Sequence, residues 1–289
     1  MSAIRIEARL RELMRAGALA KSACSSEMLS FIAPLRDAGV LAWERRGAGE
    51  VLAVCDDATL YDFIARQFPM LASELPANVS LRVAGVARFR DSKALPCDTP
   101  DILTVRAWSD TILWKDSQAI PAGEATRSYG VFSFVPVPGE RYEIRGPCAL
   151  VEGPELLLGF DRISAREECT LVIYGGGRIS RQVLDWLATQ SAPNFQLLHC
   201  PDYDPVGLNE YLRLRGALGT RVRLHVPSDL EESFARFGNR DLLRRPYNQT
   251  LLAGLRATHI PEVTFVRRLI EHHNAGLEQE RLLLEAERT

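Results

Sequence analysis

Apolar and polar positions in the second half of the chain follow a pattern typical of alternating strands and helices. Four short apolar runs predict buried strands at 148–151, 170–174, 195–200 and 222–226. The segments between them carry apolar residues three and four positions apart, which is typical of amphipathic helices. Strands buried on both faces and separated by helices predict an α/β domain with a parallel sheet covered on both sides.

The first 69 residues show a different order of elements. Residues 4–16 form a basic amphipathic pattern, and a second helix begins at Ser25. Two short strands flank a basic, glycine-rich tip that contains Arg45 and Arg46, and a closing helix follows at 57–68. This order predicts a winged-helix domain over residues 1–69. Such a domain either contacts DNA, with Arg45 and Arg46 on the backbone, or binds another protein.

Residues 70–145 are interrupted by prolines and carry strand-like runs at 80–89, 102–108 and 131–137. They predict a mostly β connecting region between the winged helix and a C-terminal domain at 146–289. Lys93 falls in a predicted loop between strands. It is either a phosphate contact or an ordinary solvated lysine.

Composition excludes several classes of protein. The six cysteines are scattered without a CxxC pair, which argues against a zinc ribbon and against a disulfide framework. No signal peptide opens the chain and no apolar run is long enough to cross a bilayer, so we expect a cytoplasmic protein. The basic residues are 32 Arg against 3 Lys. That skew reflects either a GC-rich genome or phosphate binding, and the second requires arginines that cluster in space.

Acidic residues follow two of the predicted strands. Asp202 and Asp204 come directly after the strand at 195–200, and Glu152 follows the strand at 148–151. Asp204, before Pro205, is expected to cap the next helix, which leaves Asp202 without a structural role. Because parallel strands end at one edge of a sheet, Glu152, Asp202 and Asp204 are expected to share a metal ion there. Oxygen ligands alone favour Mg²⁺ or Mn²⁺.

A triple glycine, Gly175, Gly176 and Gly177, follows the strand at 170–174 and precedes a predicted helix. Bare main-chain N–H groups in such a place suit a phosphate oxygen. Glycines also simply turn the chain, so the triple glycine alone does not decide between these two roles.

The acidic pattern resembles a known family. Glu152 after one strand and Asp202-Tyr-Asp-Pro-Val-Gly207 after another are similar to the two motifs of Toprim domains. Such domains occur in topoisomerases, bacterial primases, the topoisomerase VI A subunit and related nucleases. Together with Leu277-Glu-Gln-Glu-Arg281, the arrangement over about 146–289 resembles the Wadjet anti-plasmid nuclease subunit (JetD-type).

The resemblance implies a Rossmann-like Toprim fold and a Mg²⁺-dependent DNA endonuclease of a prokaryotic defence system. It implies that Glu152, Asp202, Asp204 and Glu278 are catalytic, and that an SMC-type ATPase complex is a partner of a homodimeric nuclease. A winged-helix DNA-binding regulator and a non-catalytic assembly subunit with a degenerate Toprim domain remain as alternatives. Tyr61 is expected to pack in the N-terminal domain, so water is the expected nucleophile. His199 is expected to be a core residue.

Overall fold

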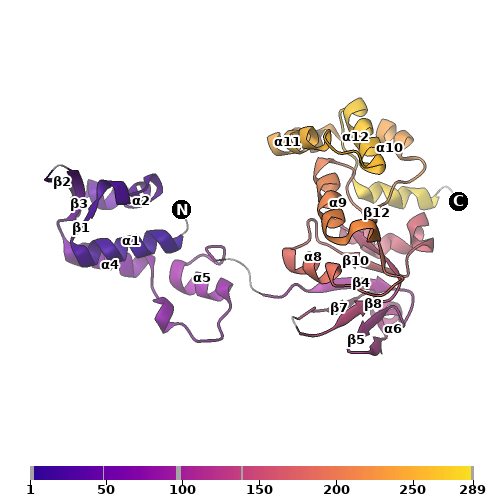
Figure 1. Ribbon diagram of the computed structural model, residues 1–289, viewed down its shortest axis with the longest axis horizontal. Coiled ribbons are helices and arrows are strands. Elements are labelled where there is room, and N and C mark those ends of the chain that lie inside the picture. Colours follow the sequence, from indigo (N-terminus) through magenta and orange to yellow (C-terminus); the bar gives the residue numbers. More distant parts are fainter. Residues whose placement is uncertain (1–2, 48, 96–98, 138, 288–289) are drawn as a thin grey trace. The chain divides into compact units, whose positions relative to one another are not determined.

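The computed structural model describes residues 3–47, 49–95, 99–137 and 139–287 (Figure 1). The chain divides into two compact units, Met1–Thr99 and Pro100–Thr289. The sequence placed a boundary at residue 146 instead. The difference arises because strands from the predicted connecting region join the main sheet of the second unit.

The first unit is a small α/β unit. Its elements, in chain order, are α1 (Ala3–Ala16), β1 (Ala18–Ala20), η1 (Lys21–Ala23), α2 (Ser26–Phe31), α3 (Ala33–Asp37), β2 (Leu41–Arg46), β3 (Gly49–Val54), α4 (Asp57–Gln67), η2 (Ala72–Glu74) and α5 (Leu81–Phe89). The strands form an antiparallel sheet in the order β1-β3-β2. The predicted helices and hairpin of residues 4–68 are therefore confirmed as secondary structure.

Local sequence signals explain where these helices begin and end. Ser25 accepts a hydrogen bond from the Met28 N–H (3.2 Å) and caps α2, and Asp56 caps α4 in the same way through Thr59 (3.0 Å). Gly17 ends α1 at a φ of +70°, a conformation that glycine adopts without steric cost. Apolar side chains from α1, α2 and α4, including Leu10, form one buried cluster with β2 and β3.

The predicted strand at 80–89 is wrong, because these residues form helix α5. Ser80 accepts a hydrogen bond from the Val83 N–H (3.4 Å) and starts the helix. The strand prediction rested on residues with high strand propensity, among them Val83 and Val86, and both valines are exposed on the helix. Residues 70–145 as a whole are mixed rather than mostly β, since α5 and a second helix, α6 (Ala122–Tyr129), accompany their short strands.

The second unit contains most of the residues that the structure describes. Its strands are β4 (Leu103–Ala107), β5 (Leu113–Lys115), β6 (Gln118–Ile120), β7 (Phe132–Phe134), β8 (Tyr142–Ile144), β9 (Pro147–Val151), β10 (Leu171–Tyr174), β11 (Gln196–Cys200) and β12 (Val222–Leu224). Its further helices are α7 (Pro154–Gly159), η3 (Phe160–Arg162), η4 (Ser164–Glu167), α8 (Arg181–Ala188), α9 (Pro205–Leu218), η5 (Gly219–Arg221), α10 (Leu230–Phe237), η6 (Arg240–Leu243), α11 (Pro246–Leu255), α12 (Pro261–His273) and η7 (Gln279–Glu287).

Six strands form the main sheet in the order β12-β11-β9-β10-β4-β7. The four strands predicted from the apolar runs lie together and are parallel, and β4 and β7 extend the sheet in antiparallel fashion. The expected α/β class with a largely parallel sheet is confirmed. A separate antiparallel sheet, β6-β5-β8, lies within the same unit.

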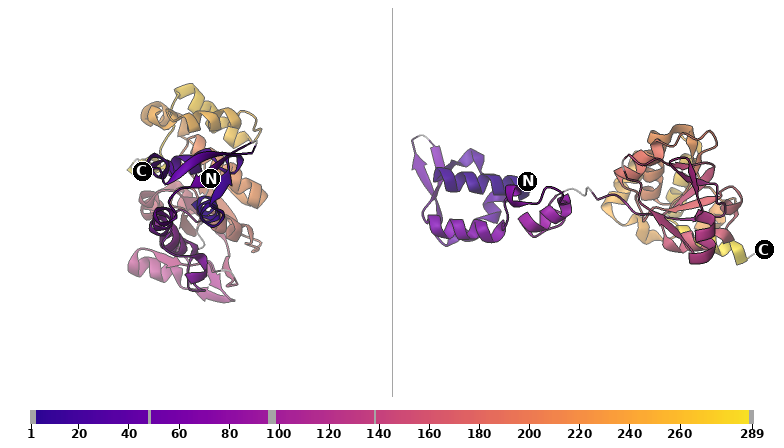
Figure 2. Two further views of the ribbon diagram at one scale, coloured as in Figure 1. Left: turned by 90° about the vertical axis from the view of Figure 1, so that its left-hand side faces the viewer. Right: turned by 90° about the horizontal axis from the view of Figure 1, so that it is seen from below.

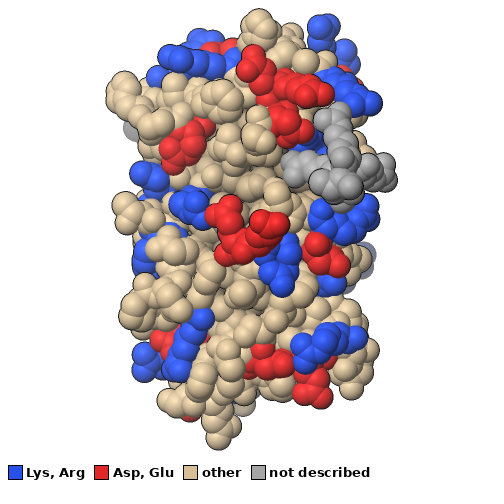
Figure 3. All heavy atoms as spheres, turned by 90° about the vertical axis from the view of Figure 1, so that its right-hand side faces the viewer, with Lys and Arg blue, Asp and Glu red and all other residues tan. Residues whose placement is uncertain are grey.

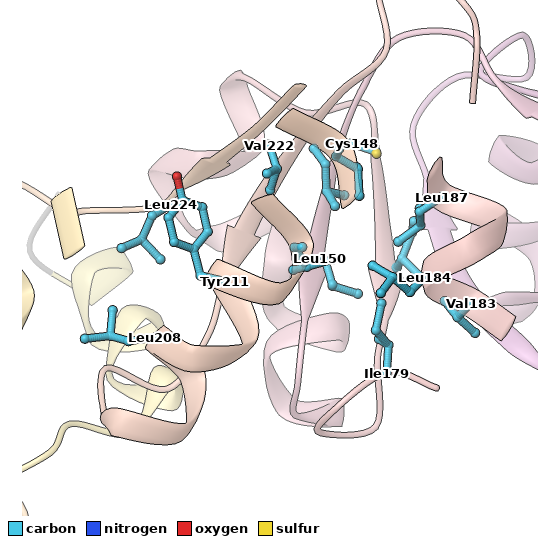
Figure 4. Close-up of a cluster of buried hydrophobic side chains, with 14 of the residues drawn as sticks. Cys148, Leu150, Ile179, Val183, Leu184, Leu187, Leu208, Tyr211, Val222 and Leu224 are labelled. Atoms are coloured by element: carbon cyan, nitrogen blue, oxygen red, sulfur yellow. The ribbon is translucent and has the colours of Figure 1, made fainter. Parts of the chain in front are cut away.

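Alternate residues of the central strand β9 face opposite sides of the sheet. Cys148 and Leu150 belong to a buried cluster with α8 and α9, whereas Ala149 and Val151 belong to another with α7 and Phe160. Figure 4 shows the first cluster, and Figure 2 shows helices around the sheet from two further directions. Burial on both faces explains why the strand reads as a continuous apolar run.

The described helices also bear on membrane association. Across residues 3–47, 49–95, 99–137 and 139–287, none of the helices combines the length and apolarity that crossing a bilayer requires.

Candidate metal centre

The acidic residues of the two motifs lie at the same edge of the main sheet. Strand β9 pairs in parallel with β11, and Val151 is in register with Cys200. Glu152 therefore follows one strand where Pro201 and Asp202 follow its neighbour. The Asp202 main chain and the charge of Asp202 both act on the pKa of Glu152, as expected for residues at adjacent strand ends. The expectation that the two motifs are spatial neighbours is confirmed.

Asp204 caps helix α9, as its position before Pro205 predicts. Its Oδ1 accepts hydrogen bonds from the N–H groups of Val206 and Gly207, each at 2.8 Å. Gly207 is required there by close packing, because a Cβ at this position would collide with the main-chain carbonyl O of Asp202. The glycine of the motif thus lets the first turn of α9 fold over the strand end that carries Asp202.

A C-terminal segment, residues 276–281, lies against the Asp202–Asp204 turn. Tyr203 and Leu277 form an antiparallel bridge, with N–H to O distances of 2.8 and 3.2 Å. The Gln279 N–H donates to Oδ1 of Asp202 at 2.9 Å, and the Gln279 side-chain Oε1 accepts from the Glu152 N–H at 3.1 Å. Gln279 therefore joins both acidic motifs to the C-terminal segment.

The packing of the C-terminal segment against the Asp202–Asp204 turn brings three carboxylates together. One carboxylate oxygen from each of Asp202, Glu278 and Glu280 lies within 4.8 Å of the others, an arrangement that could hold a metal ion. The set differs from the predicted ligands Glu152, Asp202 and Asp204. Asp202 is common to both, Asp204 uses Oδ1 as a helix cap, and Glu152 lies beside the group rather than within it.

The electrostatics of the centre favour protons or a cation. Burial raises the pKa of Glu152 to about 8, and the charges of Asp202, Asp204 and Glu210 add to the rise. Burial likewise raises the pKa of Asp204 to about 6. For Asp202, Glu278 and Glu280 burial also raises the pKa. Carboxylates that resist ionisation together are stabilised when a cation neutralises them.

The donor set fits a hard divalent cation. It consists of oxygen atoms alone, which Mg²⁺ and Mn²⁺ prefer. Oε1 of Glu152 is buried and has no hydrogen-bond partner among the described residues. A buried acceptor without a partner is costly, and a cation or its coordinated water would satisfy it.

Two arginines, Arg178 and Arg213, pair with the buried carboxylate of Glu210. Glu210 of α9 is buried and is paired with Arg213, and Arg178 lies 3.3 Å away from its carboxylate. The Arg213 guanidinium also donates to the carbonyl O of Ile179 at 2.6 Å, which fixes it beside the loop after β10. Arg178 is 57% exposed and so offers a cation to solvent next to the acidic centre.

The triple glycine does not present bare N–H groups in the predicted way. Gly175 donates to the Val151 carbonyl (2.8 Å) and Gly177 to the Glu152 carbonyl (3.2 Å). Gly176 and Gly177 have φ values of +65° and +85°, and α8 begins only at Arg181. The structure therefore favours the turn role, in which the glycines bend the chain over the end of β9.

The other predicted contacts belong to the first unit. Lys93 is exposed in a turn after α5 rather than between strands. Arg45 and Arg46 are exposed on β2, where Arg46 pairs with Glu44 at 3.1 Å. Tyr61, expected to be packed, is 61% exposed on α4, so that expectation is wrong.

His199 is a core residue, as predicted. It is 1% exposed, stacks on Tyr211, and burial lowers its pKa to about 3. The ring is therefore neutral at physiological pH. Cys148, Cys169 and Cys200 are buried and reduced, in agreement with the argument against a disulfide framework.

No family model matches this chain, and a comparison with curated proteins finds no match.

Sequence reasoning missed Gln279, Glu280 and Glu210. Gln279 and Glu280 belong to the motif Leu277–Arg281 noted above, but nothing in the spacing of that motif indicated that both residues lie beside Asp202. Glu210 had a detectable signal, since it lies in the second turn of α9 and interrupts the apolar face formed by Leu208, Tyr211 and Leu214. A buried acid at that position is typical of a polar network rather than of a core.

Proposed function

We propose that this chain is a divalent-metal-dependent nuclease that hydrolyses DNA phosphodiester bonds. The observation that carries the proposal is the convergence of Asp202, Glu278 and Glu280 at the carboxyl edge of the sheet, beside a buried Glu152 oxygen without a hydrogen-bond partner. Open α/β sheets bind ligands at this edge. Two resemblances support the same proposal. The acidic motifs resemble those of Toprim domains, and the order of α1 to α4 resembles that of a winged helix.

In this proposal Asp202, Glu278 and Glu280 hold Mg²⁺ or Mn²⁺. The bound cation would act as a Lewis acid toward a phosphate and its leaving oxygen. Glu152, at the end of the neighbouring strand, would act as the general acid or base that transfers the proton. Arg178, which is 57% exposed and pairs with Glu210 at 3.3 Å, would bind a non-bridging phosphate oxygen.

Gln279 and Asp204 orient the acidic groups rather than react. Gln279 bonds to both motifs, and Asp204 fixes the first turn of α9. We propose water as the nucleophile, so that no covalent protein–DNA intermediate forms.

The resemblance also supports an SMC-type ATPase complex as partner, a homodimer and a role in anti-plasmid or anti-phage defence. These stay predictions. Co-purification of the tagged chain with an SMC-type ATPase from its native host is the measurement that checks the partner.

The alternative is a DNA-binding regulator that uses the first unit. Exposed positions on α2 and α3, the helices before the hairpin, include Glu27 and Asp37. Acidic side chains there repel phosphates. The geometry therefore favours the nuclease over the regulator.

The deciding experiment incubates supercoiled plasmid with purified protein and Mg²⁺ or Mn²⁺. We expect nicked or linear products that vanish with EDTA and with Asp202→Asn. The matched control is Asp185→Asn, which changes an exposed aspartate paired with Arg181 on α8. DNA binding without metal-dependent cleavage by the wild-type chain would instead identify the regulator.

A further inference from the structure

The exposed arginines of the second unit are not evenly distributed. Between Ser233 and Pro261 the chain has five arginines and one acidic residue, although its net charge is −2. Most of these arginines lie in residues 236–247, here called the arginine segment, which runs from the end of α10 through η6 to the start of α11. Figure 3 shows basic and acidic side chains in small neighbouring groups on one face of the molecule.

The arginine segment is exposed and largely unpaired. Its charged and aromatic side chains are all exposed: Arg236, Phe237, Arg240, Arg244, Arg245 and Tyr247. Arg244 pairs with Asp241 at 3.0 Å. Within the part of the chain that the structure describes, Arg236, Arg240 and Arg245 form no ion pair. Several other exposed arginines of the unit, Arg127, Arg181 and Arg223 among them, do have acidic partners.

Main-chain hydrogen bonds place this segment next to the acidic centre. Asn239 and Gly276 form an antiparallel bridge, with N–H to O distances of 2.8 and 3.0 Å. The next bridge along the C-terminal segment joins Leu277 to Tyr203. A Cβ at Gly276 would lie 3.0 Å from the Cβ of Asp204 and 2.9 Å from the Leu242 side chain. The arginine segment, the C-terminal segment and the Asp202–Asp204 turn therefore lie side by side.

We infer that the arginine segment binds the backbone of a DNA strand and leads it to the acidic centre, an inference that rests on the proposed nuclease function. Guanidinium groups pair with phosphate oxygens through two parallel hydrogen bonds. Tyr247, 58% exposed, offers a ring face on which an unpaired base stacks, whereas the Arg236 guanidinium lies over the ring of Phe237, 4.9 Å from its centroid. A polyanion needs such a surface, because the carboxylates of the centre themselves repel phosphates.

The chemistry of the segment favours nucleic acid over an acidic protein. Arginines interleaved with exposed aromatic rings match a chain of alternating phosphates and bases. The three unpaired arginines lie before η6 (Arg236), at its first residue (Arg240) and after it (Arg245). This spread suits an extended ligand rather than a single anion.

The test measures binding separately from cleavage. Fluorescence anisotropy with a fluorescein-labelled oligonucleotide, single-stranded or duplex, is recorded in EDTA over about 50 to 200 mM salt. The variant Arg236→Gln/Arg240→Gln/Arg245→Gln removes the three unpaired charges. The control Arg127→Gln/Arg181→Gln/Arg223→Gln removes the same net charge from paired, exposed arginines of the same unit.

We expect the segment variant to lose at least about tenfold in affinity, and the slope of log affinity against log salt to fall by about 2 for a single strand. The affinity of the control variant is expected to stay within about twofold of the wild-type value, because salt screens surface charges that do not contact the DNA. Thermal melts establish that both variants are folded. A segment variant that binds both oligonucleotides as tightly as the control variant does would overturn the inference.

The same data separate the two proposals. If the wild-type chain fails to nick plasmid with Mg²⁺ or Mn²⁺ while the segment variant still loses binding, the nuclease proposal fails and the DNA-binding surface stands. If the wild-type chain nicks plasmid and the segment variant binds normally, the nuclease stands and the arginine segment is not its DNA-binding surface.

Discussion

The main-chain N–H of Gln279 donates a hydrogen bond to Oδ1 of Asp202 across 77 residues of sequence, at a distance of 2.9 Å. The side chain of the same glutamine accepts from the Glu152 N–H. Gln279 is 2% exposed, and both bonds are partly buried. One residue near the C-terminus therefore fixes the relative positions of the two acidic motifs and brings Glu278 and Glu280 to Asp202.

Replacing Gln279 with Leu is expected to disturb the centre. The Glu152 N–H loses its partner, which costs about 1–3 kcal/mol of unfolding free energy for a buried donor. We expect a lower Tm and a weaker affinity for Mn²⁺, measured by calorimetric titration, together with loss of nicking.

The matched control is Gln190→Leu. Gln190 is 3% exposed and accepts from the Ile144 N–H at 2.8 Å, but it lies at β8 and α8 rather than at the acidic centre. Its replacement is expected to lower Tm by a similar amount and to leave Mn²⁺ affinity unchanged. Equal losses of Mn²⁺ affinity in both variants would contradict the role given to Gln279.

Much of the sheet could be predicted from the sequence, because β9, β10 and β11 are buried on both faces and read as continuous apolar runs. The meeting of Glu152 with Asp202 followed from parallel strands that end at one edge. The position of Glu280 could not be predicted, since it depends on isolated bridges, Tyr203 with Leu277 and Asn239 with Gly276, that have no periodic signal.

The C-terminal segment illustrates a general limit of pattern reasoning. Periodicity reports which face of an element is buried, but not where a short irregular segment docks. The error at α5 has another cause, since exposed valines there carry strand propensity while Ser80 supplies a helix cap. Local capping chemistry outweighed side-chain preference in that segment.

Gly207 is expected to tolerate no side chain. A Cβ there would collide with the Asp202 carbonyl and lie 2.8 Å from the Cβ of Pro201, so Gly207→Ala must displace the strand end or the helix. We expect a loss of about 1–3 kcal/mol in unfolding free energy, measured by urea denaturation, and loss of nicking.

The control for this change lies on the same helix. Gly216 of α9 has open space around its Cβ position, and Gly216→Ala is expected to raise stability by up to about 1 kcal/mol, because alanine favours the helix. A stable, active Gly207→Ala variant would show that the contact with Asp202 is unimportant.

Glu152 makes stability depend on pH when metal is chelated with EDTA. Burial raises its pKa from 4.5 to about 8. Between these values the folded chain keeps a proton that the unfolded chain has released, so the contribution of Glu152 to stability is greatest below pH 4.5, falls as pH rises, and levels off above about 8.

We therefore expect Tm in EDTA to fall from about pH 5 to about pH 8, and to fall less in Glu152→Gln, which stays neutral throughout. Mg²⁺ should raise Tm most at the alkaline end, where the carboxylates are ionised. Thermal melts across this range measure both effects. The exposed Glu124→Gln is the control and should keep the wild-type slope; a Glu152→Gln variant with that slope would contradict the assignment.

The last prediction separates metal ligands from helix caps. Glu280→Gln removes a carboxylate from the group that Asp202 and Glu278 complete, so it is expected to weaken Mn²⁺ binding by at least about tenfold and to raise Tm in EDTA by relieving repulsion. Asp204→Asn keeps an acceptor for the Val206 and Gly207 N–H groups, so Mn²⁺ affinity should change only a few-fold. The opposite ranking of the two variants in a Mn²⁺ titration would return Asp204 to the set of ligands and remove Glu280 from it.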